Sequence, residues 1–333
     1  MSLNDKVVLI TGGTGSFGKK FTEIVLREFS PKKLIVFSRD ELKQYEMNQK
    51  YSDSPMRYFI GDVRDSDRLK LAFQGVDVVV HAAAMKQVPI CEYNPFEAVK
   101  TNVFGAQNVI EAAINCGVQK VLAISTDKAV NPINLYGATK LCAEKLFVQS
   151  NSYSGENATR FSCARYGNVV GSRGSVIPVF IQQRELGRIT VTDKRMTRFN
   201  ITLQQGVDFV LQCLNKMWGG ELFVPKIPSY RITDVAKAIN PECKLEIVGI
   251  RPGEKLHEEM ITKTDALNTV EFDDYYVILP TSKLSWDTKK FIQESNGVSG
   301  KIVTENFCYN SGTNINFLSV EELRSLIKTE LYA

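Results

Sequence analysis

Apolar residues in the first half of the chain gather in short runs, separated by longer stretches with helical periodicity. The runs are rich in β-branched residues and apolar on both faces, which favours strands in a sheet that is covered on both sides. They lie at Val7–Ile10, Leu34–Phe37, Tyr58–Gly61, Val76–His81, Val121–Ser125 and Thr159–Tyr166. The stretches between them predict helices at Gly18–Phe29, Ser66–Gln74, Pro95–Cys116 and Leu135–Ser150. Strands that alternate with helices predict an α/β fold with a doubly wound parallel sheet.

The pattern loosens after about residue 168. Gly167–Ser175 is rich in glycine and serine, and the next helices are predicted at Val179–Leu186, Leu203–Lys216 and Thr233–Ile239. Ser319 and Glu322 have the spacing of a capping box at the start of a last helix. This change predicts a second, smaller C-terminal domain. We expect residues 1–168 with about 198–224 in the sheet domain, and about 169–197 with 225–333 in the other.

Composition excludes several classes of protein. With 333 residues, of which 44% are hydrophobic and 23% charged, the chain can bury a substantial core and is not predominantly disordered. Lys and Arg number 41 against 37 Asp and Glu, and no stretch is densely basic, so no nucleic-acid partner is expected. No apolar run reaches the roughly 18 residues of a membrane span, so no membrane partner is expected either.

Reactive side chains narrow the chemistry further. The seven cysteines are scattered without a C-x-x-C spacing, and the N-terminus leads into the first predicted strand without a signal peptide; both favour a cytoplasmic protein. The two histidines, His81 and His257, are too few for a polyhistidine metal site, so no metal is expected. Neither is near a G-x-S-x-G elbow, which argues against a Ser-His-Asp hydrolase.

A glycine-rich loop separates the first predicted strand from the first predicted helix. Glycine permits the tight turn and the close approach of a pyrophosphate, and the helix N-terminus supplies free N–H donors. An ordinary turn also tolerates glycines, but the position between a strand and a helix favours dinucleotide binding. The candidate residues are Gly12, Thr14, Gly15, Ser16, Phe17 and Gly18.

The end of the second predicted strand bears on the choice of cofactor. Ser38 and Arg39 lie at the strand end, and Lys43 lies one helical turn beyond. A hydroxyl with two cations suits the 2′-phosphate of NADP, since a guanidinium forms paired hydrogen bonds with phosphate. The alternative is that Asp40 binds the ribose hydroxyls of NAD and that Arg39 is solvated. Asp62, after the third strand, is a candidate for binding the adenine edge or an ordinary turn residue.

Tyr136 and Lys140 form a Y-x-x-x-K pair, which a helix places on one face. A nearby ammonium favours the phenolate, so we expect the pKa of the tyrosine to be lowered. Such a tyrosine can accept the proton of a sugar hydroxyl while hydride leaves the carbon. The alternative is a core tyrosine with a solvated lysine, and the preceding phosphate loop favours the first interpretation.

Thr126, Asp127 and Lys128 follow the fifth predicted strand, whose C-terminal end faces the ligand crevice of a doubly wound sheet. An acid beside a base is more than simple oxidoreduction requires. Removal of water from a sugar needs one group to take a proton from carbon and another to protonate the departing hydroxyl, and Asp127 and Lys128 suit these roles. A salt-bridged loop pair is the alternative.

Together these motifs resemble the extended short-chain dehydrogenase/reductase superfamily. The loop Thr11–Gly18, the segment His81–Ala84 and the Tyr136/Lys140 pair carry this resemblance. The run from Ile124 to Lys140 is very similar to that of the UDP-N-acetylglucosamine 4,6-dehydratases. Matches to the same family occur at Ser38–Gln44, Arg165–Gly174 and Arg251–Glu258. The matches extend from residue 7 to about 260 and are closest to the inverting branch, which begins the synthesis of pseudaminic acid and related capsule sugars.

The resemblance implies a Rossmann domain that binds NADP and a smaller domain that binds UDP-N-acetylglucosamine. It implies that Tyr136 accepts the C4 hydroxyl proton, a neutral Lys128 removes the C5 proton, and a protonated Asp127 assists departure of the C6 hydroxyl. It adds Glu41, Leu42, Val63, Ala82 and Ala84 to the cofactor site. The substrate residues that it implies are Lys86, Thr126, Asn168, Val169, Arg173, Val176, Thr192, Arg251 and Glu254.

The resemblance further implies a homo-oligomer, because the helices at Pro95–Cys116 and Leu135–Ser150 pair subunits in this superfamily. Two positions depart from the family pattern: Gln87 replaces a histidine and Asn200 replaces a tryptophan, which leaves the substrate or product preference open. His257 is expected to support the substrate domain rather than to catalyse. Two other functions stay open, a nucleotide-sugar 4-epimerase that would not need Asp127 and Lys128, and a non-catalytic NADP-binding scaffold protein.

Overall fold

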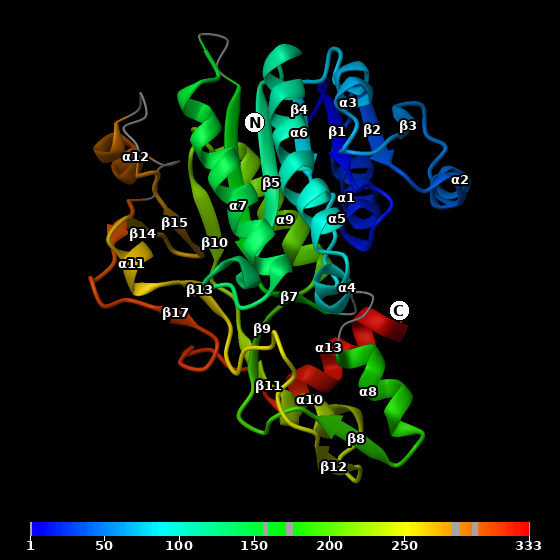
Figure 1. The fold of residues 1–333 in the computed structure, drawn as a ribbon, viewed down its shortest axis with the longest axis vertical. Coiled ribbons are helices and arrows are strands. Elements are labelled where there is room, and N and C mark those ends of the chain that lie inside the picture. The colour runs from blue at the N-terminus through cyan, green and yellow to red at the C-terminus, as the bar shows by residue number, and fades with distance from the viewer. Residues whose placement is uncertain (1, 156–158, 171–175, 282–286, 295–298, 333) are drawn as a thin grey trace.

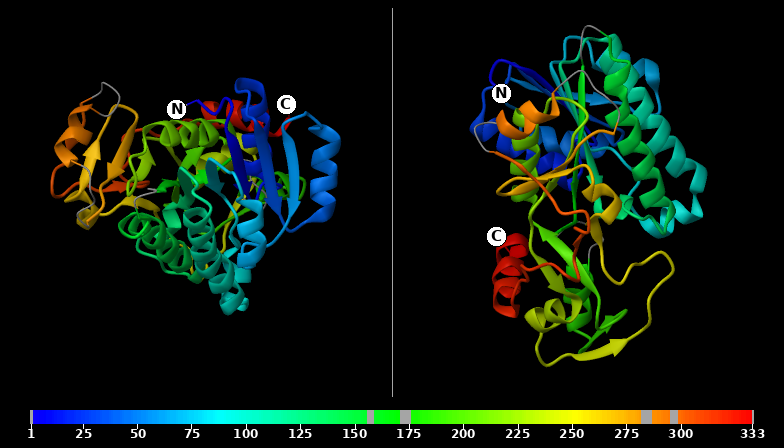
Figure 2. Two further views of the ribbon diagram at one scale, coloured as in Figure 1. Left: turned by 90° about the horizontal axis from the view of Figure 1, so that it is seen from above. Right: turned by 90° about the vertical axis from the view of Figure 1, so that its left-hand side faces the viewer.

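The structure is a computed structural model that describes residues 2–155, 159–170, 176–281, 287–294 and 299–332. Two parts follow one another along its long axis: a large sheet flanked by helices and, below it in Figure 1, a smaller group of short strands and helices. Figure 2 shows helices on both faces of the large sheet. The α/β fold predicted from the alternating pattern is confirmed.

The described residues form a ten-stranded large sheet in the order β16-β14-β15-β10-β6-β5-β4-β1-β2-β3. All neighbours from β10 to β3 are parallel, which confirms the doubly wound parallel sheet. The strand order reverses direction between β1 and β4, and such a reversal opens a ligand crevice at the carboxyl ends of the strands. The parallel strands are β1 (Val7–Thr11), β2 (Lys33–Ser38), β3 (Met56–Ile60), β4 (Val78–His81), β5 (Lys120–Thr126), β6 (Arg160–Tyr166) and β10 (Leu222–Pro225).

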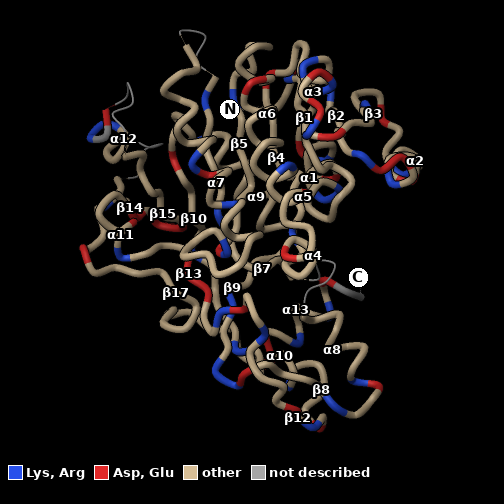
Figure 3. The backbone as a smooth tube through the Cα atoms, viewed as in Figure 1, with Lys and Arg blue, Asp and Glu red and all other residues tan. Residues whose placement is uncertain are grey.

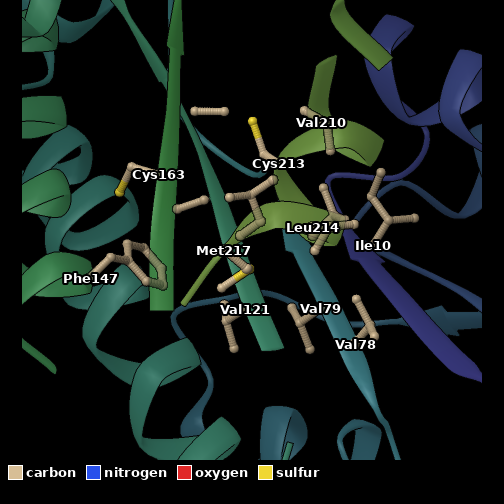
Figure 4. Close-up of a cluster of buried hydrophobic side chains, with 14 of the residues drawn as sticks. Ile10, Val78, Val79, Val121, Phe147, Cys163, Val210, Cys213, Leu214 and Met217 are labelled. Atoms are coloured by element: carbon tan, nitrogen blue, oxygen red, sulfur yellow. The ribbon is translucent and has the colours of Figure 1, made fainter. Parts of the chain in front are cut away.

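Helices α1 (Ser16–Glu28) and α9 (Leu203–Lys216) pack together on one face of this sheet. The opposite face is covered by α3 (Ser66–Ala72), α6 (Gly105–Asn115) and α7 (Leu135–Gln149), as both views in Figure 2 show. Figure 4 shows the resulting core, in which valines of β4 and β5 lie between α9 and the helices of the opposite face. The further helices here are α2 (Glu41–Lys50), α4 (Val88–Tyr93) and α5 (Pro95–Val99).

The helix predicted over Pro95–Cys116 is not continuous. Between α5 and α6 lies a π-helical turn, η1 (Lys100–Phe104). It brings the Asn102 amide against Met85, where Oδ1 accepts from the backbone N–H at 2.8 Å and Nδ2 donates to the carbonyl at 2.9 Å. The same Nδ2 donates to Thr139 Oγ1 on α7 at 3.0 Å. The turn therefore ties the segment after β4 to α7, and π-helical turns of this kind are frequent near functional sites.

The smaller part has a hydrophobic core of its own, which includes Ile177, Phe180, Val191, Val235 and Leu323. Around this core lie α8 (Val176–Arg184), α10 (Ile232–Ile239), α13 (Val320–Tyr332) and the pair β8 (Arg188–Val191) and β12 (Lys244–Ile247). A three-stranded sheet of β11 (Ser229–Arg231), β9 (Thr197–Ile201) and β7 (Asn168–Val169) connects the two parts. The predicted capping box of the last helix is present, since Ser319 and Glu322 bond each other's backbone N–H groups.

The structure differs from the predicted division of the chain in one region. Residues 225–333 were expected in the smaller domain, but β15 (Tyr275–Ile278), β14 (Thr269–Glu271) and β16 (Lys301–Ile302) extend the large sheet by antiparallel pairing. Strands of two to four residues have weak periodicity, so the sequence did not distinguish them from loops. The remaining elements here are β13 (Glu259–Ile261), β17 (Tyr309–Asn310), α11 (Lys263–Ala266) and α12 (Thr288–Glu294).

Charged residues of both signs are interspersed along the chain rather than separated by domain, as Figure 3 shows. Among the described residues, no helix combines the length and apolarity that a membrane span requires. The same residues contain no group of three or more His, Cys, Asp or Glu side chains placed to bind a metal ion.

Candidate active site

A cavity of about 620 Å³ lies at the carboxyl ends of the central parallel strands, where the strand order reverses. It is lined from both halves of the sheet and by the first residues after β6. A cleft at this position is where doubly wound sheets bind their ligands. The predicted residues that line it are Gly12, Thr14, Gly15, Ser16, Phe17, Gly18, Ser38, Arg39, Asp40, Lys43, Asp62, Val63, Ala82, Ala84, Lys86, Thr126, Lys128, Tyr136, Lys140, Asn168 and Val169.

The loop between β1 and α1 has no room for side chains at two of its glycines. Gly12 has a φ of +67°, and a Cβ there would lie 2.9 Å from Ala83 Cα. A Cβ on Gly18 would lie 2.3 Å from the Gly13 carbonyl oxygen. α1 begins at Ser16 without a side-chain cap, so its first N–H groups remain available to an anion. These features fit a pyrophosphate.

The end of β2 places a hydroxyl and two cations at one end of the cavity. Ser38 Oγ accepts hydrogen bonds from Thr14 Oγ1 at 3.2 Å and from the buried Gln44 Nε2 at 3.1 Å. Its own hydrogen is therefore left to donate toward a ligand. The Arg39 side chain is 58% exposed, with Nη1 3.5 Å from Asp62 Oδ2. Of the predicted cofactor residues, Glu41 and Leu42 do not line the cavity, and Leu42 points into solvent.

Asp40, the alternative ligand of a ribose, has a structural role in the ligand-free protein. Its carboxylate caps α2 by accepting from the Lys43 N–H at 3.0 Å. The Lys43 ammonium contacts the other carboxylate oxygen. These hydrogen bonds from Lys43 lower the pKa of Asp40. The carboxylate is thus engaged by the backbone of its own helix and by Lys43, which favours the exposed Arg39 guanidinium as the ligand-binding group.

Asp127 and Lys128 lie in a 3₁₀ turn, η2 (Asp127–Ala129), at the end of β5. The Asp127 side chain is fully buried, and its Oδ1 accepts from Lys128 Nζ at 2.9 Å and from Thr126 Oγ1 at 3.0 Å. Its Oδ2 is buried and has no hydrogen-bond partner among the described residues. Lys128 Nζ also donates to Asn168 Oδ1 at 3.2 Å. Lys128 lines the cavity and Asp127 does not, so the amine is held at the cavity wall in contact with a fully buried carboxyl.

Tyr136 and Lys140 occupy successive turns of α7, which Asn134 caps by accepting from the Gly137 N–H at 2.8 Å. Lys140 Nζ donates to the Ile124 carbonyl at 2.7 Å, and burial lowers its pKa. Burial raises the pKa of Tyr136 to about 12, although the Lys128 ammonium partly offsets this effect. The expected lowering of the Tyr136 pKa is therefore wrong for the ligand-free protein, because desolvation outweighs the nearby positive charge.

The expected lowering of the Lys128 pKa, which would make this lysine neutral, is also wrong. Burial alone would lower the pKa of this lysine, but the carboxylates of Asp127 and Glu258 raise it above its ordinary value. The direction for Asp127 agrees with the prediction, since burial raises the pKa of its carboxyl.

Glu258 and Arg198 belong to this cluster, although the sequence analysis gave them no role. Glu258 is 3% exposed, and its Oε1 lies 3.6 Å from Lys128 Nζ and 3.7 Å from Arg198 Nε. Lys255 Nζ lies 3.9 Å from Glu258 Oε2. Glu258 closes the matching segment Arg251–Glu258, which was the only signal in the sequence. Its contact with a residue so distant in the chain could not be inferred from spacing.

The predicted nucleotide-sugar residues divide into two groups. Lys86, Thr126, Asn168 and Val169 line the cavity, as does Gln87. Val176, Thr192, Arg251 and Glu254 do not line it, and Arg173 lies outside the described residues. The segment that carries Arg251 and Glu254 is nevertheless joined to the loop between β5 and α7, since Asn134 Nδ2 donates to the Gly253 carbonyl at 2.9 Å.

Two further positions have local structural roles. The His257 ring forms a 2.8 Å hydrogen bond with Thr197 Oγ1 and packs against Gly312. This placement fits the expected supporting role of His257. Asn200 is buried on β9, where its backbone N–H donates to the Pro228 carbonyl at 2.8 Å. Its Oδ1 has no hydrogen-bond partner among the described residues.

Comparison with known proteins places these features in context. Residues 8–280 match the family described as polysaccharide biosynthesis protein. The chain is 53% identical over 326 residues, 97% of its length and 98% of the relative's, to the UDP-N-acetylglucosamine 4,6-dehydratase (inverting) of Campylobacter jejuni. It is 39% identical to the UDP-glucose 4-epimerase of Rickettsia akari, over 98% of this chain and 96% of that one. The solved structure of Pen from Bacillus thuringiensis superimposes with a TM-score of 0.89 and 41% identity, covering 100% of both chains.

Proposed function

Because the chain belongs to the polysaccharide biosynthesis protein family, we propose that it is an inverting UDP-N-acetylglucosamine 4,6-dehydratase, a hydro-lyase. The observation that carries this proposal is the contact between Lys128 Nζ and Asp127 Oδ1 at 2.9 Å. Lys128 lines the same cavity as Tyr136, Lys140 and the glycine loop, and the buried Asp127 lies directly behind it. An acid and a base at this position suit the elimination of water from a sugar.

The cavity suits a nicotinamide dinucleotide. The glycine loop and the open N-terminus of α1 would hold its pyrophosphate, and Lys140 and Tyr136 lie at the other end of the cavity. We favour NADP over NAD, because Ser38, Arg39 and Lys43 offer donors for a 2′-phosphate while Asp40 caps its own helix. When bound, the nicotinamide supplies the hydride acceptor and donor, so that no net cofactor is consumed.

Tyr136 begins the reaction by accepting the proton of the C4 hydroxyl, which requires its raised pKa to fall when the site is filled. Once C4 has also given up its hydride, the resulting 4-keto group makes the C5 proton acidic. Lys128 removes that proton, Asp127 donates a proton to the C6 hydroxyl, and water leaves. C6 would then take up the hydride that C4 gave up, and C5 receives a proton on the opposite face, which gives UDP-2-acetamido-2,6-dideoxy-β-L-arabino-hexos-4-ulose.

The raised pKa of Lys128 is compatible with this scheme. Transfer of one proton from Lys128 Nζ to Asp127 Oδ1 along their 2.9 Å contact produces a neutral amine and a carboxylic acid together. These are the two forms that the elimination requires. Burial raises the pKa of Asp127, which lowers the cost of the transfer. The ion pair and the reactive pair therefore differ only in the position of one proton.

A single incubation tests this function. The protein is mixed with NADP and UDP-N-acetylglucosamine in D₂O, and the product is analysed by NMR and mass spectrometry. We expect loss of one water, about 18 Da before deuterium is counted, deuterium at C5, and inverted configuration at that carbon. A product with the mass of the substrate would instead support a nucleotide-sugar 4-epimerase, which the 39% identity to the Rickettsia akari protein keeps as the second candidate. Tight NADP binding without turnover would favour a scaffold protein.

We also propose that the protein is a homo-oligomer that pairs through the face around α4, α5 and α7. Ile90, Tyr93, Phe96 and Phe104 are exposed on α4, α5 and η1, and Phe96 and Phe104 contact each other edge to face. Exposed aromatic residues gathered in this way are typical of protein interfaces. Light scattering of the wild type and of Phe96→Glu tests this, since the glutamate should dissociate the pair.

We further propose a cytoplasmic enzyme at the first step of pseudaminic acid synthesis or of a related capsule or lipopolysaccharide sugar.

A further inference from the structure

The catalytic loop after β5 and the segment that ends at Glu258 are joined at several points. Lys255 Nζ donates to the Val130 carbonyl, and Asn131 Nδ2 donates to Glu259 Oε2 at 2.7 Å. Glu258 reaches further in, with Oε1 3.6 Å from Lys128 Nζ. The position of its backbone is fixed by Ser311, whose Oγ accepts from the Glu258 N–H at 2.9 Å and whose N–H donates to the Glu258 carbonyl at 2.8 Å.

The charges around Lys128 explain why this contact matters. Asp127 and Glu258 provide two buried carboxyl groups, and the cations are Lys128 itself, Arg198 on β9 and Lys255. Without Glu258, only one carboxylate would remain among these cations. Uncompensated buried positive charge favours loss of a proton from the lysine and keeps Asp127 ionised. Among the described residues, the phenols Tyr136 on α7 and Tyr230 on β11 also face this cluster, His257 interacts with Arg198, and Glu259 interacts with Lys255.

We infer that Glu258 is a positioning residue of the dehydration, which holds Lys128 at Asp127 and keeps the Lys128–Asp127 pair singly protonated across neutral pH. This inference rests on the proposed function. The singly protonated pair is the form that can shift its one proton from Lys128 to Asp127 before elimination. Glu258 touches neither reacting carbon nor cofactor in this scheme, and it acts through Lys128.

The sign of the effect follows from charge. The negative Glu258 raises the pKa of Lys128 and also raises the pKa of Asp127. Because the two groups are in contact, their titrations belong to the pair, and the limits of a bell-shaped pH–rate profile report the gain and the loss of its proton. Removing the charge of Glu258 should therefore move both limits toward lower pH.

The test is the pH dependence of water loss from UDP-N-acetylglucosamine in the full-length protein with NADP. Glu258→Gln keeps the shape and the backbone bonds to Ser311, and we expect both limits to move down by about one pH unit with KM little changed. Glu258→Asp keeps the charge and should restore the limits even where kcat is lower. Lys255→Met removes a cation from Glu258 and should move the limits upward. Unmoved limits in Glu258→Gln would overturn the inference even where kcat is lower, because a loss of packing alone would explain such a result.

Glu259→Gln is the matched control. Glu259 is the adjacent carboxylate, and it accepts a hydrogen bond from Asn131 in the loop that carries Lys128. Among the contacts of the described residues, however, there is none between Glu259 and Lys128. We expect the two limits of the pH–rate profile of Glu259→Gln to remain at the wild-type positions. Equal shifts in Glu259→Gln and Glu258→Gln would indicate a general charge effect and would also overturn the inference.

A second readout does not depend on turnover. Carboxyl ¹³C NMR of the ligand-free protein, with the Asp127 signal assigned through Asp127→Asn, follows the titration of that group directly. The Asp127 midpoint should be lower in Glu258→Gln than in the wild type, and equal midpoints would contradict the inference. Failure of the wild type to release water would contradict the proposed function instead, and the NMR comparison would still decide the effect of Glu258.

Discussion

Gly137 and Lys128 approach so closely that a Cβ on Gly137 would lie 2.1 Å from the Lys128 carbonyl oxygen. This contact sets α7, and with it Tyr136, against the catalytic loop. Gly137→Ala should push the two apart, and a displacement of about 1 Å at a catalytic group costs on the order of 100-fold in rate. We therefore expect a fall of about 100-fold in kcat for water loss, measured by mass spectrometry under saturating substrate.

The control for this variant is Gly206→Ala. Gly206 also lies within a helix, α9, but a Cβ there would have its nearest neighbour, Tyr166 Cζ, at 4.0 Å. With the backbone compatible and the space free, the alanine should stabilise the protein by about 0.4–1 kcal/mol and leave the rate unchanged. Similar kinetics for the two alanine variants would show that the approach of α7 to the loop is not required for catalysis.

Lys128→Met should abolish dehydration without loss of the cofactor. The variant lacks the group that takes the C5 proton, so we expect water loss to slow by at least about 100-fold, while the dissociation constant for NADP stays within about twofold. Lys145→Met, an exposed position on the same side of the sheet on α7, controls for removal of a positive charge. Wild-type turnover of Lys128→Met would refute the proposed mechanism.

His81 should make the stability of the protein depend on pH. Its ring is buried and hydrogen-bonded to Thr11 Oγ1 at 2.8 Å, and burial lowers its pKa from the model-peptide value of 6.5 to about 3. Between these two values the folded state binds fewer protons than the unfolded state, so the free energy of unfolding falls as the pH falls. The contribution of the neutral His81 ring to the free energy of unfolding is complete above pH 6.5 and is lost toward pH 3.

The variant His81→Asn keeps a polar group opposite Thr11 and removes the titration. In urea unfolding at pH 7, 6 and 5, the wild type should lose stability faster on acidification than the variant, by up to about 1.4 kcal/mol per pH unit. All other groups titrate equally in both proteins, so the difference between the curves isolates His81. Parallel curves would mean that the imidazole is protonated without penalty.

Local patterns in the sequence predicted the sheet and much of the cavity. The loop from Gly12 to Gly18 was predictable because a strand, a tight turn and a helix follow one another in the chain. The closeness of Tyr136 and Lys140 was predictable because helical spacing alone determines it. In each case the interacting residues lie within one or two adjacent elements.

Features that depend on residues distant in the sequence were predicted wrongly or missed. The charge of Lys128 depends on Glu258, which is distant in the sequence. In the folded protein Glu258 Oε1 lies 3.6 Å from Lys128 Nζ. Burial decides the pKa of Tyr136, and burial is a property of the packed structure rather than of the Y-x-x-x-K spacing. The π-helical turn in 100–104 likewise carries no periodicity of its own, and it emerged only from the packing of Asn102 between Met85 and α7.

Arg39→Glu should reverse the preference for NADP over NAD. Arg39 is exposed at the cavity and lies 3.5 Å from Asp62 Oδ2, so its guanidinium can turn to a phosphate without breaking a buried bond. A glutamate would repel the 2′-phosphate and offer an acceptor to ribose hydroxyls. Since the cofactor is regenerated in each cycle, the measurement is equilibrium binding of NADP and NAD by calorimetry. We expect the ratio of the two affinities to fall by at least about tenfold, as for the loss of one charge-assisted contact. Arg57→Glu makes the same change of charge on β3. Its guanidinium donates to the carbonyls of Ser54 and Met56 and does not line the cavity, so this variant should leave the ratio unchanged. An unchanged ratio in Arg39→Glu would place the 2′-position of the cofactor elsewhere and would return Asp40 as the ribose ligand.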